Sequence, residues 1–216
     1  MRKSLIIIII ALIFLGAGGW YFWMESKKPA PSSETKPMPE QSSSKKIAML
    51  IAFKDFQDQE YFNTKEVLES GGAVITTLSA SLGQAVGKYG GEVKIEKKLE
   101  ELDVKDFDAV VFIGGSGAFN YIDNSKCHQI AKEAAKQDKV LGAICIAPAI
   151  LAKAGVLREK KATVWTSSLD RSAEKILKEN GADYQDDDVV VDGKIVTANG
   201  PAAAKKFGQA IATLLK

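Results

Sequence analysis

The chain has 216 residues, of which 46% are hydrophobic and 26% are charged, and its formal net charge is +2. This balance is ordinary for a globular protein and excludes the strongly basic surface of a typical nucleic-acid-binding protein. Acidic and basic residues alternate along the chain, so we expect no nucleic-acid partner. Two cysteines, one histidine and the lack of CxxC and HExxH motifs predict neither a disulfide framework nor a metal site, and no cofactor.

Residues 1–24 differ in composition from the rest of the chain. Arg2 and Lys3 precede an apolar run that ends in an aromatic cluster at residues 20–23. About 20 apolar residues span the ~30 Å hydrocarbon core of a bilayer. We therefore predict a transmembrane signal anchor over 1–24, with the folded domain outside the cytoplasm, at the cell surface or in the periplasm. A cleaved signal peptide and a secreted protein are the alternative, because residues 16–19 are small.

Residues 25–45 are rich in proline and serine and have almost no apolar side chains. Such a segment cannot bury enough apolar surface to fold, and we predict a disordered linker. Residues 46–216 then form one folded domain of ordinary size.

In this domain, short apolar runs alternate with helical patterns. Strands are predicted over residues 46–53, 73–79, 107–115, 140–144 and 161–166, and residues 86–96 predict a turn and a short strand. Helices are predicted over 54–72, 124–139, 147–155, 167–181 and 201–216. Residues 189–198 predict a hairpin that turns at Asp192 and Gly193. The alternation favours an α/β sandwich with a mainly parallel sheet.

Three informative stretches come directly after predicted strands, at residues 53–60, 114–120 and 145–148. The carboxyl ends of parallel strands lie at one edge of a sheet, where ligands of α/β proteins bind. We therefore expect the three stretches to meet at one site.

Cys145 lies between a strand and a helix that has Pro148 in its first turn. The positive end of a helix dipole stabilises a thiolate, although a buried, unreactive cysteine is equally compatible with this position. The backbone N–H groups of Gly115 and Ser116 could form an oxyanion hole, or a plain tight turn. The Glu60 carboxylate could interact favourably with the positive end of the helix dipole, or it could exchange a proton with the Cys145 thiol.

The segments "FQDQEYF", "FDAVVFIGG", "GAICIAPAILAKAGVL" and "DGKIVTANGPAAAKKFGQAIA" resemble, in this order, the ThiJ/PfpI superfamily. This superfamily includes the parkinsonism-associated deglycase, small-aldehyde glyoxalases and PfpI-type peptidases. The resemblance covers about residues 46–216 and implies a flavodoxin-like three-layer sandwich, like that of class I glutamine amidotransferases. It also implies Cys145 as nucleophile, Glu60 as its partner, Gly115 and Ile146 as backbone oxyanion donors, and a homodimer or higher homo-oligomer.

Two positions depart from the pattern of the superfamily. Ile146 replaces the histidine of PfpI-type peptidases, and Trp165 replaces a histidine of the parkinsonism-associated branch. Peptidase chemistry is therefore disfavoured, since it needs a base and a leaving-group acid. The resemblance instead implies a glutathione-independent glyoxalase or deglycase that uses Cys145 and Glu60 on small reactive dicarbonyls. A redox-sensing module with an oxidisable cysteine and a non-catalytic binding module are the alternatives.

The predicted helix that begins near Asn124 runs back along the strand at 140–144, which would place its N-terminus at the same edge as Cys145. His128 is therefore a candidate auxiliary base, and Cys127 a candidate disulfide partner of Cys145. Spacing alone does not fix side-chain direction, so packing or solvent-exposed roles are the alternative for both.

Overall fold

A computed structural model describes residues 44–216. Its main sheet has seven strands in the order β11 (Val189–Asp192), β12 (Ile195–Ala198), β8 (Val140–Ile144), β7 (Ala109–Phe112), β1 (Lys46–Leu50), β3 (Val74–Ser79) and β6 (Lys97–Lys98). Only β11 and β12 pair antiparallel; the other neighbours are parallel. The five central strands have the 2-1-3-4-5 order of flavodoxin-like proteins, so the predicted fold class is confirmed.

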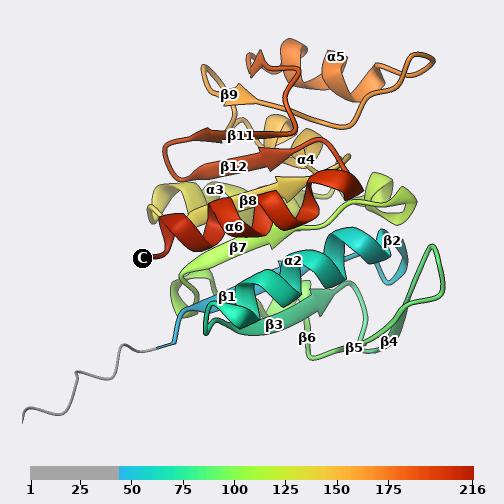
Figure 1. Ribbon diagram of the computed structural model, residues 1–216, viewed down its shortest axis with the longest axis vertical. Helices are drawn as coiled ribbons and strands as arrows, with labels where there is room; N and C mark the ends of the chain where they lie inside the picture. The colour runs from blue at the N-terminus through green and yellow to red at the C-terminus, as the bar shows by residue number, and fades with distance from the viewer. Residues whose placement is uncertain (1–43) are drawn as a thin grey trace, which may run out of the picture. The chain divides into compact units, whose positions relative to one another are not determined.

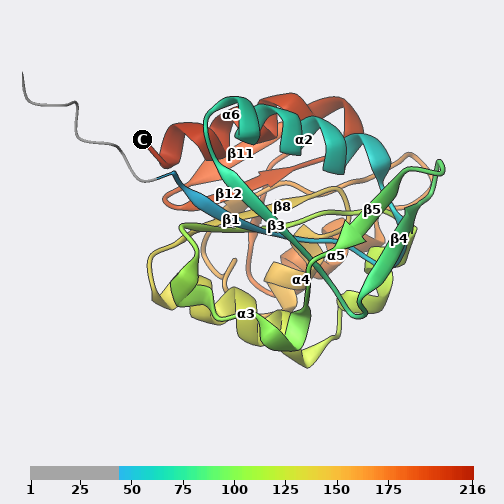
Figure 2. The same cartoon turned by 90° about the horizontal axis from the view of Figure 1, so that it is seen from below.

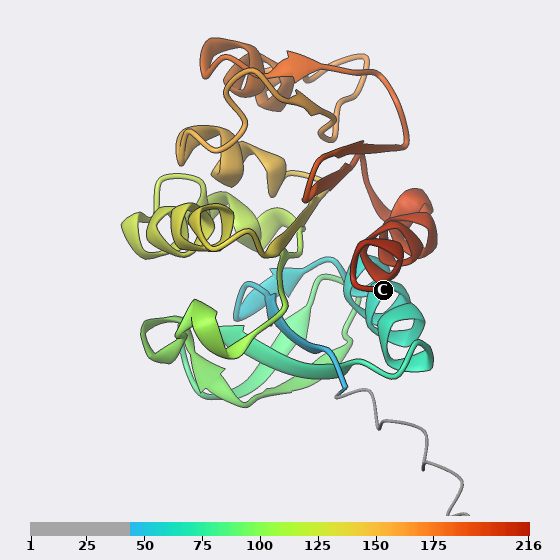
Figure 3. The ribbon, with the colours of Figure 1, turned by 90° about the vertical axis from the view of Figure 1, so that its left-hand side faces the viewer.

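Helices cover both faces of this sheet, which gives three layers (Figures 2 and 3). α2 (Asp58–Ser70) and α6 (Ala204–Leu214) pack together on one face, and α3 (Ser125–Lys136) and α4 (Pro148–Lys153) lie on the other. Strands β7 and β8 are buried at every position. They are apolar throughout because a strand covered on both faces has no solvent side to fill with polar residues.

Smaller elements surround the sheet. A three-stranded sheet consists of β2 (Lys54–Phe56), β4 (Gly83–Gly87) and β5 (Glu92–Ile95). Two-residue strands β9 (Lys161–Ala162) and β10 (Asp183–Tyr184) pair beside α5 (Ser172–Glu179). Short 3-10 helices are η1 (Leu99–Glu101), η2 (Val104–Asp106), η3 (Ser116–Tyr121) and η4 (Pro201–Ala203).

Several predicted elements are longer than those in the structure, and two of them have clear causes. The helix predicted from residue 54 begins at Asp58, because residues 54–56 pair with β4 and the side chain of Gln57 caps α2 by accepting from Gln59 N at 3.0 Å. The strand predicted over 161–166 has only two paired residues, since residues 163–166 turn toward Cys145 and Trp165 N donates to the Cys145 carbonyl at 2.9 Å.

Within residues 44–216, no helix is both long enough and apolar enough to cross a membrane. The predicted anchor at 1–24 and the predicted linker up to residue 43 lie outside the described residues.

The packing of α6 on the sheet predicts a large stability effect at Phe207. This side chain is fully buried and lies over the bare backbone of Gly142 in β8. We expect Phe207→Ala to lower the free energy of unfolding by about 3–5 kcal/mol, measured by urea denaturation. Leu169→Ala removes an apolar side chain that is 97% exposed, and it should change stability by no more than about 0.5 kcal/mol. Equal losses in the two variants would contradict this packing.

Candidate active site

The carboxyl ends of the central parallel strands lie at one edge of the sheet, beside β2, β4 and β5 (Figure 1). The loops that follow β7 and β8 contribute to a pocket of about 330 Å³ at this edge. The pocket is lined by Gln57, Lys88, Tyr89, Gly115, Ser116, Phe119, Cys145, Ile146, Trp165 and Pro201. The predicted convergence of three separate stretches is thus confirmed, and it lies next to the switch point of the strand order, where ligands of this fold class bind.

Cys145 occupies a strained turn between β8 and α4. Its φ angle is +63°, a left-handed conformation that costs a non-glycine residue about 1 kcal/mol or more. Two backbone hydrogen bonds hold the turn: Cys145 N donates to Ala198 O at 2.9 Å, and Cys145 O accepts from Trp165 N at 2.9 Å. The sharp turn leaves the side chain partly exposed in the pocket, as in enzymes that present a nucleophile between a strand and a helix.

Glu60 lies beneath Cys145, in the first turn of α2. It is completely buried, and its Oε2 accepts a hydrogen bond from Gly114 N at 3.1 Å. Its Oε1 has no hydrogen-bond partner among residues 44–216. The Cys145 thiol is near enough to lower the carboxyl pKa, but it does not satisfy Oε1 by hydrogen-bond geometry. The contact between the two groups is therefore loose, and one carboxyl oxygen is buried without a partner in this part of the chain.

The absence of a side chain at Gly114 allows Glu60 and Cys145 to meet. A Cβ at this position would lie 2.5 Å from the Cβ of Cys145 and 2.7 Å from Oε2 of Glu60. Both distances are far below van der Waals contact, so any larger residue would separate the pair. The first glycine after β7 is thus required by the close approach of the two functional side chains.

The two side chains are electrostatically coupled. Burial raises the pKa of Glu60 to about 8, against smaller opposing effects from Cys145 and the Gly114 N–H. Burial and then the Glu60 charge raise the pKa of Cys145, while the backbone N–H groups of Gly115 and Ile146 lower it. Of the two alternatives for Cys145, the shift favours the buried thiol over the stabilised thiolate, because burial and the neighbouring carboxylate outweigh the N–H donors. The repulsion disappears when Glu60 holds a proton, so ionisation of the thiol depends on the protonation of Glu60.

Two backbone N–H groups act on the sulfur. Those of Gly115 and Ile146, which the family resemblance implies as oxyanion donors, lower the pKa of the Cys145 thiol, whereas Ser116 does not contribute to it. Pro148 occupies the first turn of α4, where it has no intrahelical N–H to provide. The pocket residues Lys88 and Tyr89 were missed by sequence reasoning, because their positions depend on how the β4–β5 hairpin folds. Gln57 and Phe119 lie within the predicted stretches, but the sequence did not single them out.

His128 and Cys127 lie elsewhere. His128 Nε2 is 2.7 Å from Ile122 O, and its side chain does not line the Cys145 pocket. Cys127 is a fully buried free thiol whose pKa is raised to about 12 by burial and by the charge of Glu100. The structure brings neither residue to the nucleophile. Within residues 44–216, no group of three or more His, Cys, Asp or Glu side chains is arranged to hold a metal ion.

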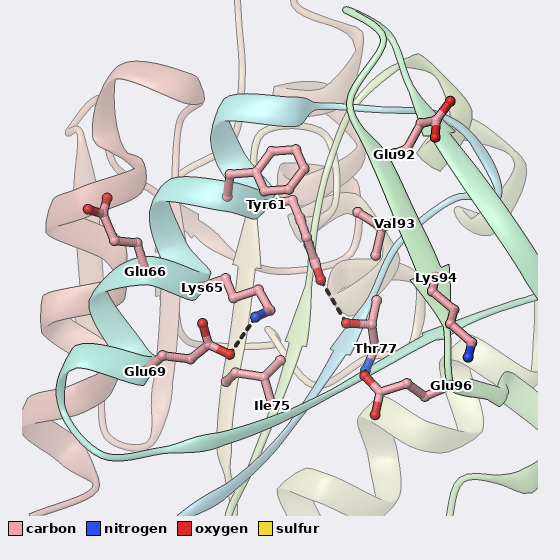
Figure 4. A pocket seen from close by; sticks show the side chains of 11 residues that line it. Tyr61, Lys65, Glu66, Glu69, Ile75, Thr77, Glu92, Val93, Lys94 and Glu96 are labelled. Atoms are coloured by element: carbon pink, nitrogen blue, oxygen red, sulfur yellow. Dashed lines mark hydrogen bonds and ion pairs between the residues drawn. The ribbon is translucent and has the colours of Figure 1, made fainter.

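A larger surface pocket, of about 480 Å³, lies between α2, β3 and β5 (Figure 4). Its polar groups are largely paired with one another. Tyr61 Oη lies 2.8 Å from Thr77 Oγ1, Thr77 N donates to Glu96 Oε1 at 3.1 Å, and Lys65 pairs with Glu69. This pocket contains no nucleophile, so the smaller pocket around Cys145 is the candidate active site.

The family model of the DJ-1/PfpI family matches residues 45–214. The chain belongs to this family. Among its relatives, a Methanocaldococcus jannaschii protein without an assigned function is 40% identical over 76% of this chain and 78% of its own. A Bacillus subtilis relative provisionally named as a cysteine protease is 33% identical over 80% of this chain and 99% of its own. A Pyrococcus abyssi relative named as a deglycase is 30% identical over 78% of this chain and 98% of its own.

Solved structures of DJ-1/PfpI proteins have the same fold. The ThiJ/PfpI domain protein of Brachyspira murdochii superposes with a TM-score of 0.76 and 34% sequence identity, over 80% of this chain and 96% of that one. The membership of the family thus agrees with the strand order of the sheet.

Burial of Glu60 predicts how stability depends on pH. Between the ordinary glutamate pKa of about 4.3 and the native value of about 8, the folded protein binds a proton that the unfolded chain has released. The free energy of unfolding should therefore decrease as pH rises through this window, by up to about 1.4 kcal/mol per pH unit from this group. Glu60→Gln should remove that slope, which urea denaturation at several pH values would reveal. Parallel pH profiles for the two proteins would contradict the raised pKa.

The close approach at Gly114 predicts that Gly114→Ala uncouples the pair. The added methyl group would separate Glu60 from Cys145, so the pH profile of Cys145 alkylation by iodoacetamide should become that of Glu60→Gln. Gly71→Ala at the C-terminal end of α2 is the matched control, since Gly71 has an ordinary φ of −81° and the nearest atom to an added Cβ is the Leu68 carbonyl oxygen at 3.2 Å. The control should keep the wild-type profile, whereas an unchanged profile in Gly114→Ala would disprove the steric argument.

Proposed function

We propose that the protein is a glutathione-independent glyoxalase or deglycase that acts on small reactive dicarbonyls through Cys145 and Glu60. The observation that carries this proposal is the buried pair itself: a nucleophile on a strained turn above a carboxyl group with a raised pKa and an unpartnered oxygen. The deglycase name of the Pyrococcus relative supports the same chemistry.

Nucleophilic addition is the first step of the proposed reaction. The Cys145 thiol passes its proton to the Glu60 carboxylate, and the sulfur forms a bond to the aldehyde carbon of methylglyoxal as the C=O π electrons move to the oxygen. Glu60 supplies the proton that neutralises this alkoxide, which produces a hemithioacetal and a Glu60 carboxylate. The N–H groups of Gly115 and Ile146, which donate to the sulfur in the resting site, stabilise the negative charge that precedes addition.

Proton transfer between adjacent carbons follows. The Glu60 carboxylate removes the proton from the former aldehyde carbon, and the electron pair moves to the ketone oxygen to give an enediolate. A proton passes from one oxygen to the other, and Glu60 returns its proton to the second carbon, which leaves a lactoyl thioester on Cys145. Water hydrolyses this thioester to lactate and the free thiol. A carboxylate with a raised pKa is a stronger base, so burial of Glu60 favours removal of the carbon-bound proton.

Peptidase and sensor functions fit the pocket less well. The residue after the nucleophile is Ile146, and His128 does not line the pocket, so no imidazole is available to protonate a leaving amine. Oxidation requires thiolate character, which the raised pKa of Cys145 disfavours while Glu60 is ionised. A redox-sensing module is therefore the second candidate and a non-catalytic binding module the third.

The location and assembly of the protein remain proposals as well. The apolar run at residues 1–24 supports a tether that holds the domain outside the cytoplasm, with secretion after cleavage as the alternative. Resemblance to the family supports a homodimer or a larger homo-oligomer.

Lactate production from methylglyoxal without glutathione tests the proposed function in the full-length protein. We expect activity in the wild type, background activity in Cys145→Ser, and a loss of about 10²–10⁴-fold in Glu60→Gln. Cys127→Ala is the matched control, because this thiol is buried away from the pocket, and it should retain activity.

The outcomes separate the three candidates. Activity that survives Cys145→Ser would disprove the mechanism. An inactive wild type whose Cys145 is oxidised by hydrogen peroxide faster than a free thiol would favour the sensor, as measured by peptide mass spectrometry. An inactive protein with a slowly oxidised thiol would leave the binding module.

A further inference from the structure

Lys88 is the only side chain with a positive charge among the residues that line the Cys145 pocket. The other walls are aromatic, apolar or neutral polar groups, and the only carboxyl group at the site, Glu60, is buried beneath Cys145. Lys88 forms no ion pair with any carboxylate of residues 44–216; its Nζ lies 5.8 Å from the centre of the Tyr89 ring. The pocket thus presents a cation without a counter-ion in that part of the chain.

The loop that carries Lys88 is fixed to the catalytic elements. Lys88 N donates to Phe56 O at 2.9 Å, which ties the loop to the end of β2. The Asp58 carboxylate accepts from Tyr89 N at 2.9 Å and from Gly91 N at 2.6 Å. Asp58 lies two residues before Glu60, so the first turn of α2 positions both the base and the loop.

Glycines make this attachment possible. A Cβ at Gly87 or at Gly91 would lie 2.5 Å from an Asp58 carboxylate oxygen, so a larger residue at either position would displace the Asp58 carboxylate. Gly87 N also donates to Gly91 O at 2.7 Å and closes the turn. Both oxygens of the Asp58 carboxylate accept hydrogen bonds from these backbone N–H groups, and the carboxylate forms no ion pair with the Lys88 ammonium group.

We propose that Lys88 selects substrates that bear a carboxylate a few bonds from the aldehyde, so that the preferred substrate class is the anionic 2-oxoaldehydes. The inference rests on the proposed function and specifies its substrate class. One lysine supplies a single positive charge, which matches a monoanion better than a doubly charged phosphate. A neutral donor supports the same end of the pocket: the Gln57 side-chain oxygen is occupied by Gln59 N, which leaves its NH₂ group to donate.

Alkylation of Cys145 tests this charge preference without requiring turnover. The full-length protein is treated with iodoacetate or with neutral iodoacetamide, and modification of Cys145 is followed by peptide mass spectrometry. We expect Lys88→Gln to lower the iodoacetate-to-iodoacetamide rate ratio about five- to tenfold, as for loss of one charge-assisted contact at a partly exposed site. Lys88→Glu should lower the ratio further.

Lys94→Gln is the control, because Lys94 lies in the same hairpin and lines the other pocket. This control should keep the wild-type ratio, and matched urea midpoints would show that the variants fold. An equal ratio in the wild type and Lys88→Gln would overturn the proposal.

The second part of the test measures the turnover of two substrates. The carboxylate-bearing 2-oxoaldehyde 4,5-dioxopentanoate is compared with neutral 2-oxopentanal, which has the same carbon chain. We expect Lys88→Gln to lower kcat/KM about five- to tenfold for the anion, mainly through KM, and to leave the neutral compound unchanged. An unchanged preference would overturn the role of Lys88 while the proposed function stands. If neither compound is converted, the proposed function fails, and the alkylation ratio alone decides whether the pocket selects anions.

Discussion

The close approach of three backbone segments at Gly114 determines the architecture of the site. Gly114 follows the end of β7, α2 brings Glu60 against one side of it, and the turn after β8 brings Cys145 against the other. Parallel neighbours in the sheet make this meeting possible, because their carboxyl ends lie at the same edge. The strand order brings Glu60 and Cys145 to the same edge of the sheet, and the absence of a Cβ at Gly114 lets the two ionisable groups come close enough to interact.

Backbone strain at Cys145 and burial of the Glu60 carboxyl group lower the stability of the domain. Cys145 has a left-handed backbone, and Glu60 has a carboxyl group with no exposed surface. Both features cost free energy. They persist because the surrounding apolar strands, the hydrogen bond from Cys145 N to Ala198 O and the hydrogen bond from Trp165 N to Cys145 O hold the turn in place. Such costs are typical of functional positions in a domain whose remaining core is conventionally packed.

The sequence predicted the fold well because its signals were local or periodic. The run Val140–Ile144 is apolar throughout, as a strand covered on both faces must be, and Gly193 supplies the left-handed turn of the last hairpin. The pairing of Cys145 with Glu60 was accessible only through resemblance to a family. The position of Lys88 at the pocket was not predictable. Its loop is held by hydrogen bonds to Asp58, which lies about thirty residues earlier in the chain.

The direction of the pKa changes distinguishes this pair from a simple activated thiolate. A helix dipole alone would lower the thiol pKa, yet burial of Cys145 and the charge of Glu60 act in the opposite direction. The proton shared by the pair then matters more than the charge of either group: Glu60 must hold it for the sulfur to ionise easily, and must lose it to become a base. An electrophile whose oxygen accepts that proton during addition satisfies both requirements in one event, and the aldehyde of the proposed substrates is such an electrophile.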